Sequence, residues 1–388
     1  MVSRRAIVIS TLGITQTLSW ASSYYLTAIF ADPVSADLHI SRSFFFGVVS
    51  AALLASGLLG PMAGRMIDRH GGRDVLALTN LAFAAGLAIM AFAQGPATLI
   101  LAWTAIAIGM GFGLYEAAFA TATGLYGQAA RNAITGITLI AGFASTVGWP
   151  TSRFLVETVG WRDAALVWAA LHIVVGLPMN RFIIPKTAAA PPTPQAAREP
   201  TGPAQAGSVN KTMIILAGVF GVTWFISASL AAHLPRLLQA MGATPDAAVA
   251  ASALVGPAQV AARLFEFSVL RRVSPMSSAR LSTILNPIGA IGLAIFGPVA
   301  AIPFVLLHGA GNGMLTIARG TLPLALFGPE GYGLRTGLLA APARITQGAA
   351  PLVFGLVLDR GGPTAALMFC VALMGASCFV LCLLHPKA

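Results

Sequence analysis

The 388-residue chain is 57% hydrophobic and carries charged side chains at only 9% of its positions, far below the roughly 25% of a soluble domain. This composition excludes a water-soluble globular protein and leaves the lipid bilayer as the surrounding solvent. The net charge of +11 does not indicate a nucleic-acid partner, because the Lys and Arg residues lie mostly at the ends of apolar runs.

Apolar runs bounded by charged or turn residues predict twelve membrane-spanning helices. In the first half they cover 6–30, 43–63, 75–94, 98–122, 134–156 and 163–184. In the second half they cover 211–235, 246–267, 280–297, 301–323, 335–358 and 364–384. The stretch 185–210 is polar and proline-rich and predicts a flexible linker. The domain prediction is therefore an N-terminal six-helix bundle over 1–184 and a C-terminal one over 211–388.

The basic residues also predict an orientation. Most of the 23 Lys and Arg residues fall in the termini, the linker and alternate loops, which places both termini and the linker in the cytoplasm. The first apolar run continues to about Phe30 without a convincing cleavage site, so it predicts a membrane helix and not a signal peptide. We expect a monomer in the inner membrane of a bacterial cell, surrounded by the lipid bilayer.

Glycines repeat at close to half the chain length. GMGFG starts at Gly109 and GAGNG starts at Gly309, and further glycines and prolines match after them. The pairs are Gly109/Gly309, Gly111/Gly311 and Gly113/Gly313 at an offset of 200, then Gly136/Gly337, Pro150/Pro351 and Gly160/Gly361 at 201. Parallel repeats with a binding site at their interface are a known plan of transporters. The repeat therefore predicts two related membrane bundles.

The loop between the second and third spans reads GRMIDRHGGRD from Gly64 to Asp74. Gly64 permits close approach of helices, and Asp68 near a helix end can pair with a neighbouring helix or its dipole. The two glycines that follow make a tight turn. An ordinary basic loop that obeys the positive-inside rule is the alternative interpretation.

This loop resembles the signature loop of the major facilitator superfamily, and it lies where that family carries it. Six spans, a long linker and six spans extend the resemblance over the whole chain. The resemblance implies an all-α integral membrane protein with two six-helix bundles related by a parallel pseudo-two-fold repeat. It also implies that the loop is a latch in an alternating-access cycle, with these gating residues: Gly64, Asp68, Arg69, Gly71, Gly72 and Arg73. The second half departs from the motif, so the resemblance does not imply a second latch there.

Ionisable side chains inside spans are costly and usually face a cavity. Arg344 lies nine residues into the eleventh span, about 14 Å deep at 1.5 Å per residue. It needs an acidic partner or an anionic substrate, and we favour a role in substrate binding or coupling over a purely structural ion pair. Arg263 and Glu266 are three residues apart near the cytoplasmic end of the eighth span, which favours gating. Arg153 lies near the outer end of the fifth span and can extend its charge to the interface.

The fourth and tenth spans diverge just after the glycine repeat. Glu116 aligns with Thr316, and Arg319 aligns with Phe119. The resemblance implies that the first, fourth, seventh and tenth helices line the central cavity, so both side chains are expected to reach the aqueous path. Glu116 is the candidate proton-coupling residue, because a buried carboxyl group can change charge as its neighbours move. A fixed Glu–Arg pair between two helices is the alternative.

Polar and aromatic residues mark the spans that the resemblance places around the cavity. Gln16, Trp20 and Tyr24 lie at i, i+4 and i+8 on one face of the first span. The seventh and tenth spans add further candidates for substrate binding: Trp224, His308 and Asn312. As a set they indicate a mainly apolar small-molecule site with a few polar groups. Hydrogen bonding between helices is the alternative for each of them.

The surplus of positive side chains within the spans favours a secondary active transporter of a small organic anion such as a carboxylate, coupled to protons. The alternative is an efflux antiporter for apolar or cationic compounds. This alternative is supported by Glu116 and by the aromatic residues Trp20 and Tyr24 on one face of the first span. It is also supported by GFASTVGWP from Gly142 to Pro150, which loosely resembles an antiporter motif. An enzyme is not expected, because GMGFG follows no strand and no residues have the spacing of a metal or catalytic site. No cofactor or metal is predicted.

Overall fold

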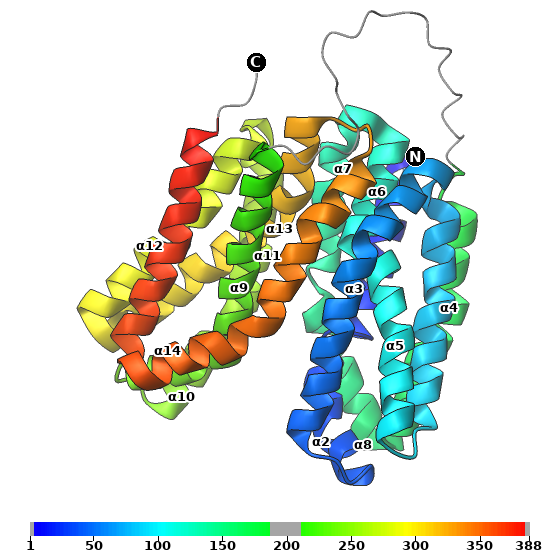
Figure 1. Ribbon diagram of the computed structural model, residues 1–388, viewed down its shortest axis with the longest axis horizontal. Coiled ribbons are helices and arrows are strands. Elements are labelled where there is room, and N and C mark those ends of the chain that lie inside the picture. The colour runs from blue at the N-terminus through cyan, green and yellow to red at the C-terminus, as the bar shows by residue number, and fades with distance from the viewer. Residues whose placement is uncertain (1–3, 187–210, 385–388) are drawn as a thin grey trace, which may run out of the picture. The chain divides into compact units, whose positions relative to one another are not determined.

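The computed structural model describes residues 4–186 and 211–384, which are helical almost throughout (Figure 1). Most of the predicted linker, 187–210, lies outside the described residues. By contacts between residues the chain separates into two units: Met1–Asn210 with Phe327–Leu338, and Lys211–Leu326 with Leu339–Ala388. The start of the eleventh span is thus counted with the first unit.

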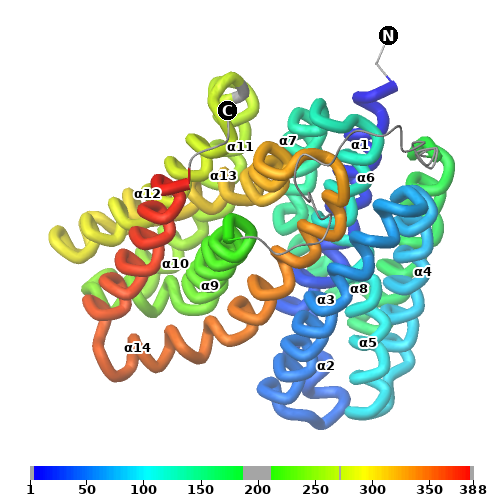
Figure 2. Tube along the Cα trace, turned by 45° about the horizontal axis from the view of Figure 1, so that its top comes forward, coloured from blue at the N-terminus to red at the C-terminus, as the bar shows by residue number. Residues whose placement is uncertain are grey.

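The first unit holds the helices of the first half of the chain. They are α1 Arg4–Ala21, α2 Thr27–Asp37, α3 Arg42–His70, α4 Gly72–Ala91, α5 Pro96–Gly113, α6 Tyr115–Tyr126, α7 Ala130–Ala141 and α8 Ala144–Leu171, with short segments η1 Gly127–Ala129, η2 His172–Gly176 and η3 Met179–Ile183. Helix α5 packs against α3 and α4, and α1 packs against α7 and α8. Both views show α4 and α5 side by side (Figures 1 and 2).

The second unit holds the helices of the second half. They are α9 Lys211–Ala240, α10 Pro245–Ala253, α11 Val255–Ser268, α12 Pro275–Phe296, α13 Ala301–Phe327 and α14 Tyr332–Leu383, with short segments η4 Leu270–Arg272 and η5 Gly297–Ala300. Buried side chains of α9, α12, α13 and α14 form one apolar cluster that includes Leu230, Leu293, Phe304 and Phe354. This cluster joins the helices that carry the candidate site.

Helices among the described residues cover the apolar runs that the sequence predicts as spans in both halves of the chain. Seven helical stretches are long and apolar enough to cross a membrane, and the three longest contain more than one passage each. Two passages can share one continuous helix assignment because a glycine turns the chain between them. Gly160 in α8 has φ 80°, and Gly362 in α14 has φ 77°. This left-handed conformation costs glycine little.

These turn glycines define the register of the internal repeat. Gly160 pairs with Gly362 at an offset of 202, so the predicted partner Gly361 is wrong by one residue. The same offset pairs Gly111 with Gly313, which pack on the second passage of their halves. A Cβ on Gly111 would meet Leu59 and Ser56 of α3, and one on Gly313 would meet Gln259 of α11.

The offset of 202 also pairs Gly109 with Gly311. A Cβ on Gly109 would meet Phe83 of α4, and one on Gly311 would meet Ser282 of α12. Helices α4 and α12 are the third passages of their halves. The predicted offset of 200 is wrong because it would match Gly109 with Gly309, which packs on α11. The corrected register places Glu116 opposite Ala318 and Arg319 opposite Ala117. The acid and the base therefore occupy neighbouring positions of the repeat, a difference that the predicted alignment concealed.

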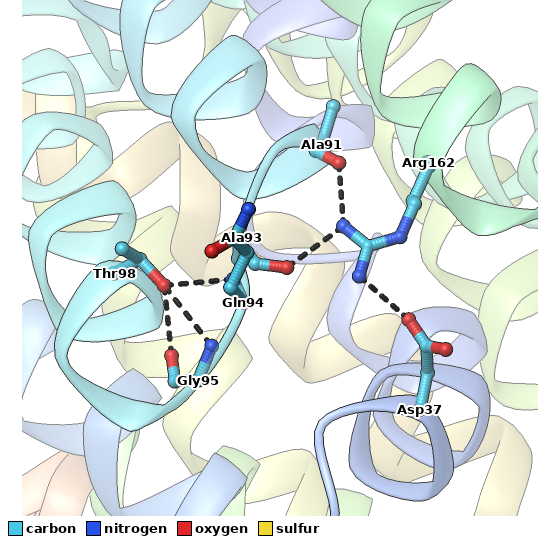
Figure 3. A network of polar contacts seen from close by, with 7 residues as sticks. All are labelled: Asp37, Ala91, Ala93, Gln94, Gly95, Thr98 and Arg162. Carbon is cyan, nitrogen blue, oxygen red and sulfur yellow. Dashed lines mark hydrogen bonds and ion pairs between the residues drawn. The ribbon is translucent and has the colours of Figure 1, made fainter.

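Arg162, just after the first turn glycine, joins three helix ends in the first unit (Figure 3). Its Nη1 donates to the carbonyl oxygens of Ala91 and Ala93 at 2.7 and 2.8 Å, and its Nη2 donates to Asp37 at 2.7 Å. Carbonyl groups at the end of a helix such as α4 lack helical partners, and a cation there is favourable. The contacts fix the ends of α2, α4 and α8 relative to one another.

Candidate functional site

Two arginine side chains lie against the same tryptophan ring in the second unit. The guanidinium carbon of Arg319 on α13 is 4.2 Å from the ring centroid of Trp224 on α9. The guanidinium carbon of Arg344 on α14 is 4.8 Å from the same centroid. Both distances are within the roughly 6 Å at which an aromatic face attracts a cation. The structure thus brings together three of the predicted substrate-binding residues.

Burial distinguishes the two arginines. Arg344 is only 4% exposed, whereas Arg319 is partly exposed. Arg344 donates from Nη1 to Oε1 of Gln347 at 3.5 Å, and Arg319 donates from Nη2 to Oγ1 of Thr223 at 3.4 Å. These hydrogen bonds are long and their acceptors are neutral, so they orient the guanidinium groups only weakly. The sequence did not single out Thr223 or Gln347, since neither carries a charge.

Side chains along α9 and α14 hold these two helices together. The contacts are Thr346 Oγ1 to the Gly221 carbonyl at 2.9 Å, Ser229 Oγ to the Ala350 carbonyl at 3.3 Å, His233 Nε2 to the Pro351 carbonyl at 2.8 Å, and the ion pair of Arg236 with Asp359. Because they tie the backbones at several levels, Arg344 is held against Trp224 by more than its own contact.

The two polar residues predicted on the tenth span lie farther along α13. His308 is buried and hydrogen-bonds Asn286 of α12 at 2.9 Å. It lies 11 residues from Arg319, which is about 16 Å along a helix. Asn312 is partly buried, and its carbonyl accepts a hydrogen bond from Thr316. The contacts of His308 fit the alternative of hydrogen bonding between helices, and substrate contact by either residue stays a prediction.

Aromatic rings gather in the first unit around the end of α1. The ring of Trp20 lies 5.7 Å from that of Tyr24 and 5.2 Å from that of Tyr115 on α6. The rings of Tyr25 and of Trp149 on α8 lie 5.6 Å apart and extend the group. The sequence predicted Trp20 and Tyr24 but missed Tyr25, which lies off their i, i+4 spacing, and Tyr115 and Trp149, which come from neighbouring helices. We call these five residues the aromatic cluster.

The fourth span is broken within its glycine run. Helix α5 ends at Gly113 and α6 begins at Tyr115, with Leu114 in an extended conformation between them. The break removes the helical partner of the Gly113 carbonyl, and Gln16 of α1 donates its side-chain amide to that oxygen at 2.6 Å. Non-helical backbone at membrane depth is tolerated only inside protein or beside a water-filled cavity.

Glu116 lies in the first turn of α6, directly after this break. A negative charge is favourable at a helix N-terminus, so the break provides a local reason for an acid in an apolar span. Glu116 is partly exposed, and its carboxylate acts electrostatically on the buried Tyr332 of α14, as that of Asp68 does. The proton-coupling role of Glu116 stays a prediction.

The motif loop caps the start of α14 within the first unit. The Asp68 carboxylate accepts hydrogen bonds from the backbone N–H groups of Gly333 and Leu334, both at 2.9 Å. The first N–H groups of a helix have no helical partners, and an anion there interacts favourably with the helix dipole. A side chain on Gly64 would collide with the Gly333 backbone. The predicted pairing of Asp68 with a neighbouring helix is therefore present.

The rest of the motif forms the turn into α4. Gly71 has φ 81°, the conformation expected of a tight glycine turn. Gly72 begins α4, and a side chain there would collide with Thr121. Arg73 forms an ion pair with Asp74 at 3.0 Å, whereas Arg69 is exposed. Their part in gating stays a prediction.

Arg263 and Glu266 of α11 are both buried, at 5% and 4% exposure. Arg263 donates from Nη2 to Gln259 at 3.3 Å and to Thr316 of α13 at 3.4 Å. A charged side chain this deeply buried links α11 to α13 and does not extend to the lipid surface. The sequence predicts a gating role for Arg263 and Glu266 near the cytoplasmic end of the eighth span, and this role stays a prediction.

The sequence model of the Major Facilitator Superfamily matches residues 12–314. The chain belongs to the Major Facilitator Superfamily. It is therefore an integral membrane transporter and not an enzyme. An uncharacterized 38 kDa protein of Thermoproteus tenax is 26% identical over 358 residues, covering 86% of this chain and 85% of that protein.

Solved structures of the superfamily share the fold at low identity. The human organic anion transporter MFSD10 (TETRAN) matches with a TM-score of 0.72 and 15% identity over 97% of this chain and 99% of its own. The Escherichia coli fucose:proton symporter FucP matches with a TM-score of 0.73 and 14% identity over 98% and 99%. The fold class predicted from the sequence is confirmed.

Proposed function

We propose that this superfamily member transports small organic anions, carboxylates among them, by alternating access coupled to protons. The observation that carries the proposal is the pair of guanidinium groups on Trp224, one of them buried. Arginine binds a carboxylate through two parallel hydrogen bonds, and a cation deep in a membrane protein is stabilised by such a ligand. The fold shared with an organic anion transporter is consistent with it.

The proposed moving parts are the predicted domains, 1–184 and 211–388, joined by the linker 185–210. The proposed gate is the motif loop, whose Asp68 caps α14. The proposed site for the coupling proton is Glu116 after the break in the fourth span. We also propose that the termini and the linker face the cytoplasm.

Ligand-induced thermal stabilisation of the purified protein tests the anion proposal, because a ligand that binds only the folded state raises apparent stability. We expect small carboxylates to raise the melting temperature of the wild type and not of Arg344→Ala. The control is Arg360→Ala, an exposed arginine of α14, which should respond as the wild type does. Carboxylates that stabilise Arg344→Ala equally well would contradict the proposal.

A second candidate function is export of cationic compounds, and the aromatic cluster beside Glu116 is the observation that favours it. Aromatic faces and a carboxylate together attract organic cations. Trp20, Tyr24 and Tyr115 lie in the same unit as Glu116, which follows Tyr115 directly. If cationic drugs stabilise the protein and carboxylates do not, this function replaces the anion transporter.

A further inference from the structure

We infer that Arg319 and Arg344 bind one substrate together and that this substrate is a short dicarboxylate. The inference rests on the proposed function and specifies the class of anion. Its basis is that one indole ring holds both guanidinium groups. Their central carbons are at most 9.0 Å apart, the sum of the two distances to the shared centroid.

This spacing suits one ligand with two charged ends. Hydrogen bonds between guanidinium and carboxylate groups are about 2.8 Å long, so each arginine reaches a carboxylate placed beside the indole. Carbon–carbon bonds of about 1.5 Å allow dicarboxylates of roughly two to four carbon atoms to place one carboxylate near each arginine. In longer chains the two carboxylates would extend past the pair. A monocarboxylate would use one arginine only.

The difference in burial gives the two arginines separate tasks. Arg344 is 4% exposed and held by the contacts between α9 and α14, so it provides a fixed anchor for the first carboxylate. Arg319 is partly exposed and hydrogen-bonded to Thr223, so it can receive the second carboxylate from the accessible side. Trp224, which both guanidinium groups contact, keeps the two cations within reach of one ligand.

The test compares succinate with butyrate, which has the same number of carbon atoms and one carboxylate fewer. Affinities are measured by thermal stabilisation of the purified full-length protein at pH 7.5, where both carboxyl groups of succinate are ionised. A second charged contact predicts that succinate binds about tenfold tighter than butyrate or more. In Arg319→Gln we expect succinate affinity to fall to that of butyrate, while butyrate affinity changes by less than about threefold.

Two more variants separate charge from folding. Arg319→Lys keeps the charge and should retain part of the preference for succinate, and Arg360→Gln should leave it unchanged. The second unit contains a single tryptophan among the six of the sequence, Trp224, so succinate should change tryptophan fluorescence in the wild type and not in Trp224→Phe. A fluorescence change that persists in Trp224→Phe would place the ligand elsewhere and overturn the inference.

The outcomes distinguish this inference from the function on which it rests. Equal wild-type affinities for succinate and butyrate would overturn the two-charge ligand and leave an anion transporter. A preference for succinate that persists undiminished in Arg319→Gln would remove Arg319 from the site and overturn the inference as well. If neither these acids nor other small carboxylates bind at all, both the inference and the proposed function fail.

Discussion

In the second unit, Arg319 and Arg344 lie close together although both are positively charged, because both contact the ring of Trp224. With an effective dielectric constant near 20, two unit charges up to 9.0 Å apart repel each other by about 2 kcal/mol or more. Each cation–π contact contributes an attraction of roughly 0.5–2 kcal/mol, more where water is excluded. Trp224 therefore offsets much of the repulsion between the two guanidinium groups.

Removal of the Asp68 carboxylate is expected to lower the stability of the protein. In Asp68→Ala the N–H groups of Gly333 and Leu334 lose their acceptor. We expect a loss of about 1–3 kcal/mol in the free energy of unfolding, because hydrogen bonds to a charged group are among the stronger ones. The measurement is the midpoint of thermal or denaturant unfolding of the purified protein in detergent.

Asp32→Ala is the control for this prediction. Asp32 forms an ion pair with Arg42 at 3.1 Å, but both side chains are at least 60% exposed. Exposed ion pairs contribute about 0–1 kcal/mol, so this variant should unfold close to the wild type. Equal effects of the two substitutions would show that Asp68 is an ordinary surface acid and that its contact with α14 contributes nothing.

Single residues show what the sequence could and could not predict about the site. Arg344 and Arg319 were predictable because a charge in an apolar span requires a partner. That both contact Trp224 was not, because three separate helices meet there and the faces they present depend on packing. His308 shows the opposite case: it is polar and was a candidate for substrate binding, but it hydrogen-bonds Asn286 from the adjacent helix.

A broken helix in the fourth passage was not predicted, because the apolar run 98–122 is continuous. The break at Leu114 depends on the Gln16 amide, which takes the place of a helical donor to the Gly113 carbonyl. In Gln16→Leu this buried carbonyl has no such donor, so we expect a loss of about 1–3 kcal/mol in stability. Thermal unfolding measures the loss, and hydrogen exchange should increase around residues 113–116. Unchanged melting and exchange would contradict the role of Gln16.

The register of the repeat gives a second prediction for these passages. Gly111 and Gly313 both pack on the second passage of their halves, so Gly111→Ala and Gly313→Ala should each destabilise the protein by about 1–3 kcal/mol. Gly124→Ala, in the same fourth passage, meets no atom within 4 Å. It should be neutral or stabilise by up to about 1 kcal/mol, because alanine favours the helix. Unfolding midpoints of the three variants are compared with the wild type.

A marked difference between Gly111→Ala and Gly313→Ala would contradict the offset of 202. The sequence identified the repeat but not its register, because glycines recur along these helices and an alignment by letters cannot tell which face each one presents. The turn glycines decide between registers, since Gly160 and Gly362 share a left-handed conformation that their neighbours do not adopt.

For the whole molecule, composition and the spacing of apolar runs were sufficient to predict the fold, since lipid requires every passage to be a helix. Residues 163–184 and 364–384 were predicted as separate passages because charged and turn residues, 157–162 and 359–363, precede them. The chemistry of transport was not predictable to the same extent. The residues that we propose for it include Glu116 and Arg319, whose positions in the repeat became clear only from the glycines that pack around them.

Proton coupling is a property of the whole transport cycle, and Glu116 provides its test. In proteoliposomes, an imposed pH gradient should accelerate net transport of a carboxylate by the wild type. Glu116→Gln retains the size of the side chain but cannot ionise, so its net transport should lose most of the acceleration by the gradient. Exchange of labelled for unlabelled substrate without a gradient should persist, because it does not require a proton to be released.

Glu157→Gln, in an exposed ion pair with Arg153, is the matched control and should behave as the wild type does. Gradient-driven transport that is undiminished in Glu116→Gln would exclude Glu116 as the coupling residue, and loss of both activities would instead assign it to substrate binding or to the fold of the fourth passage.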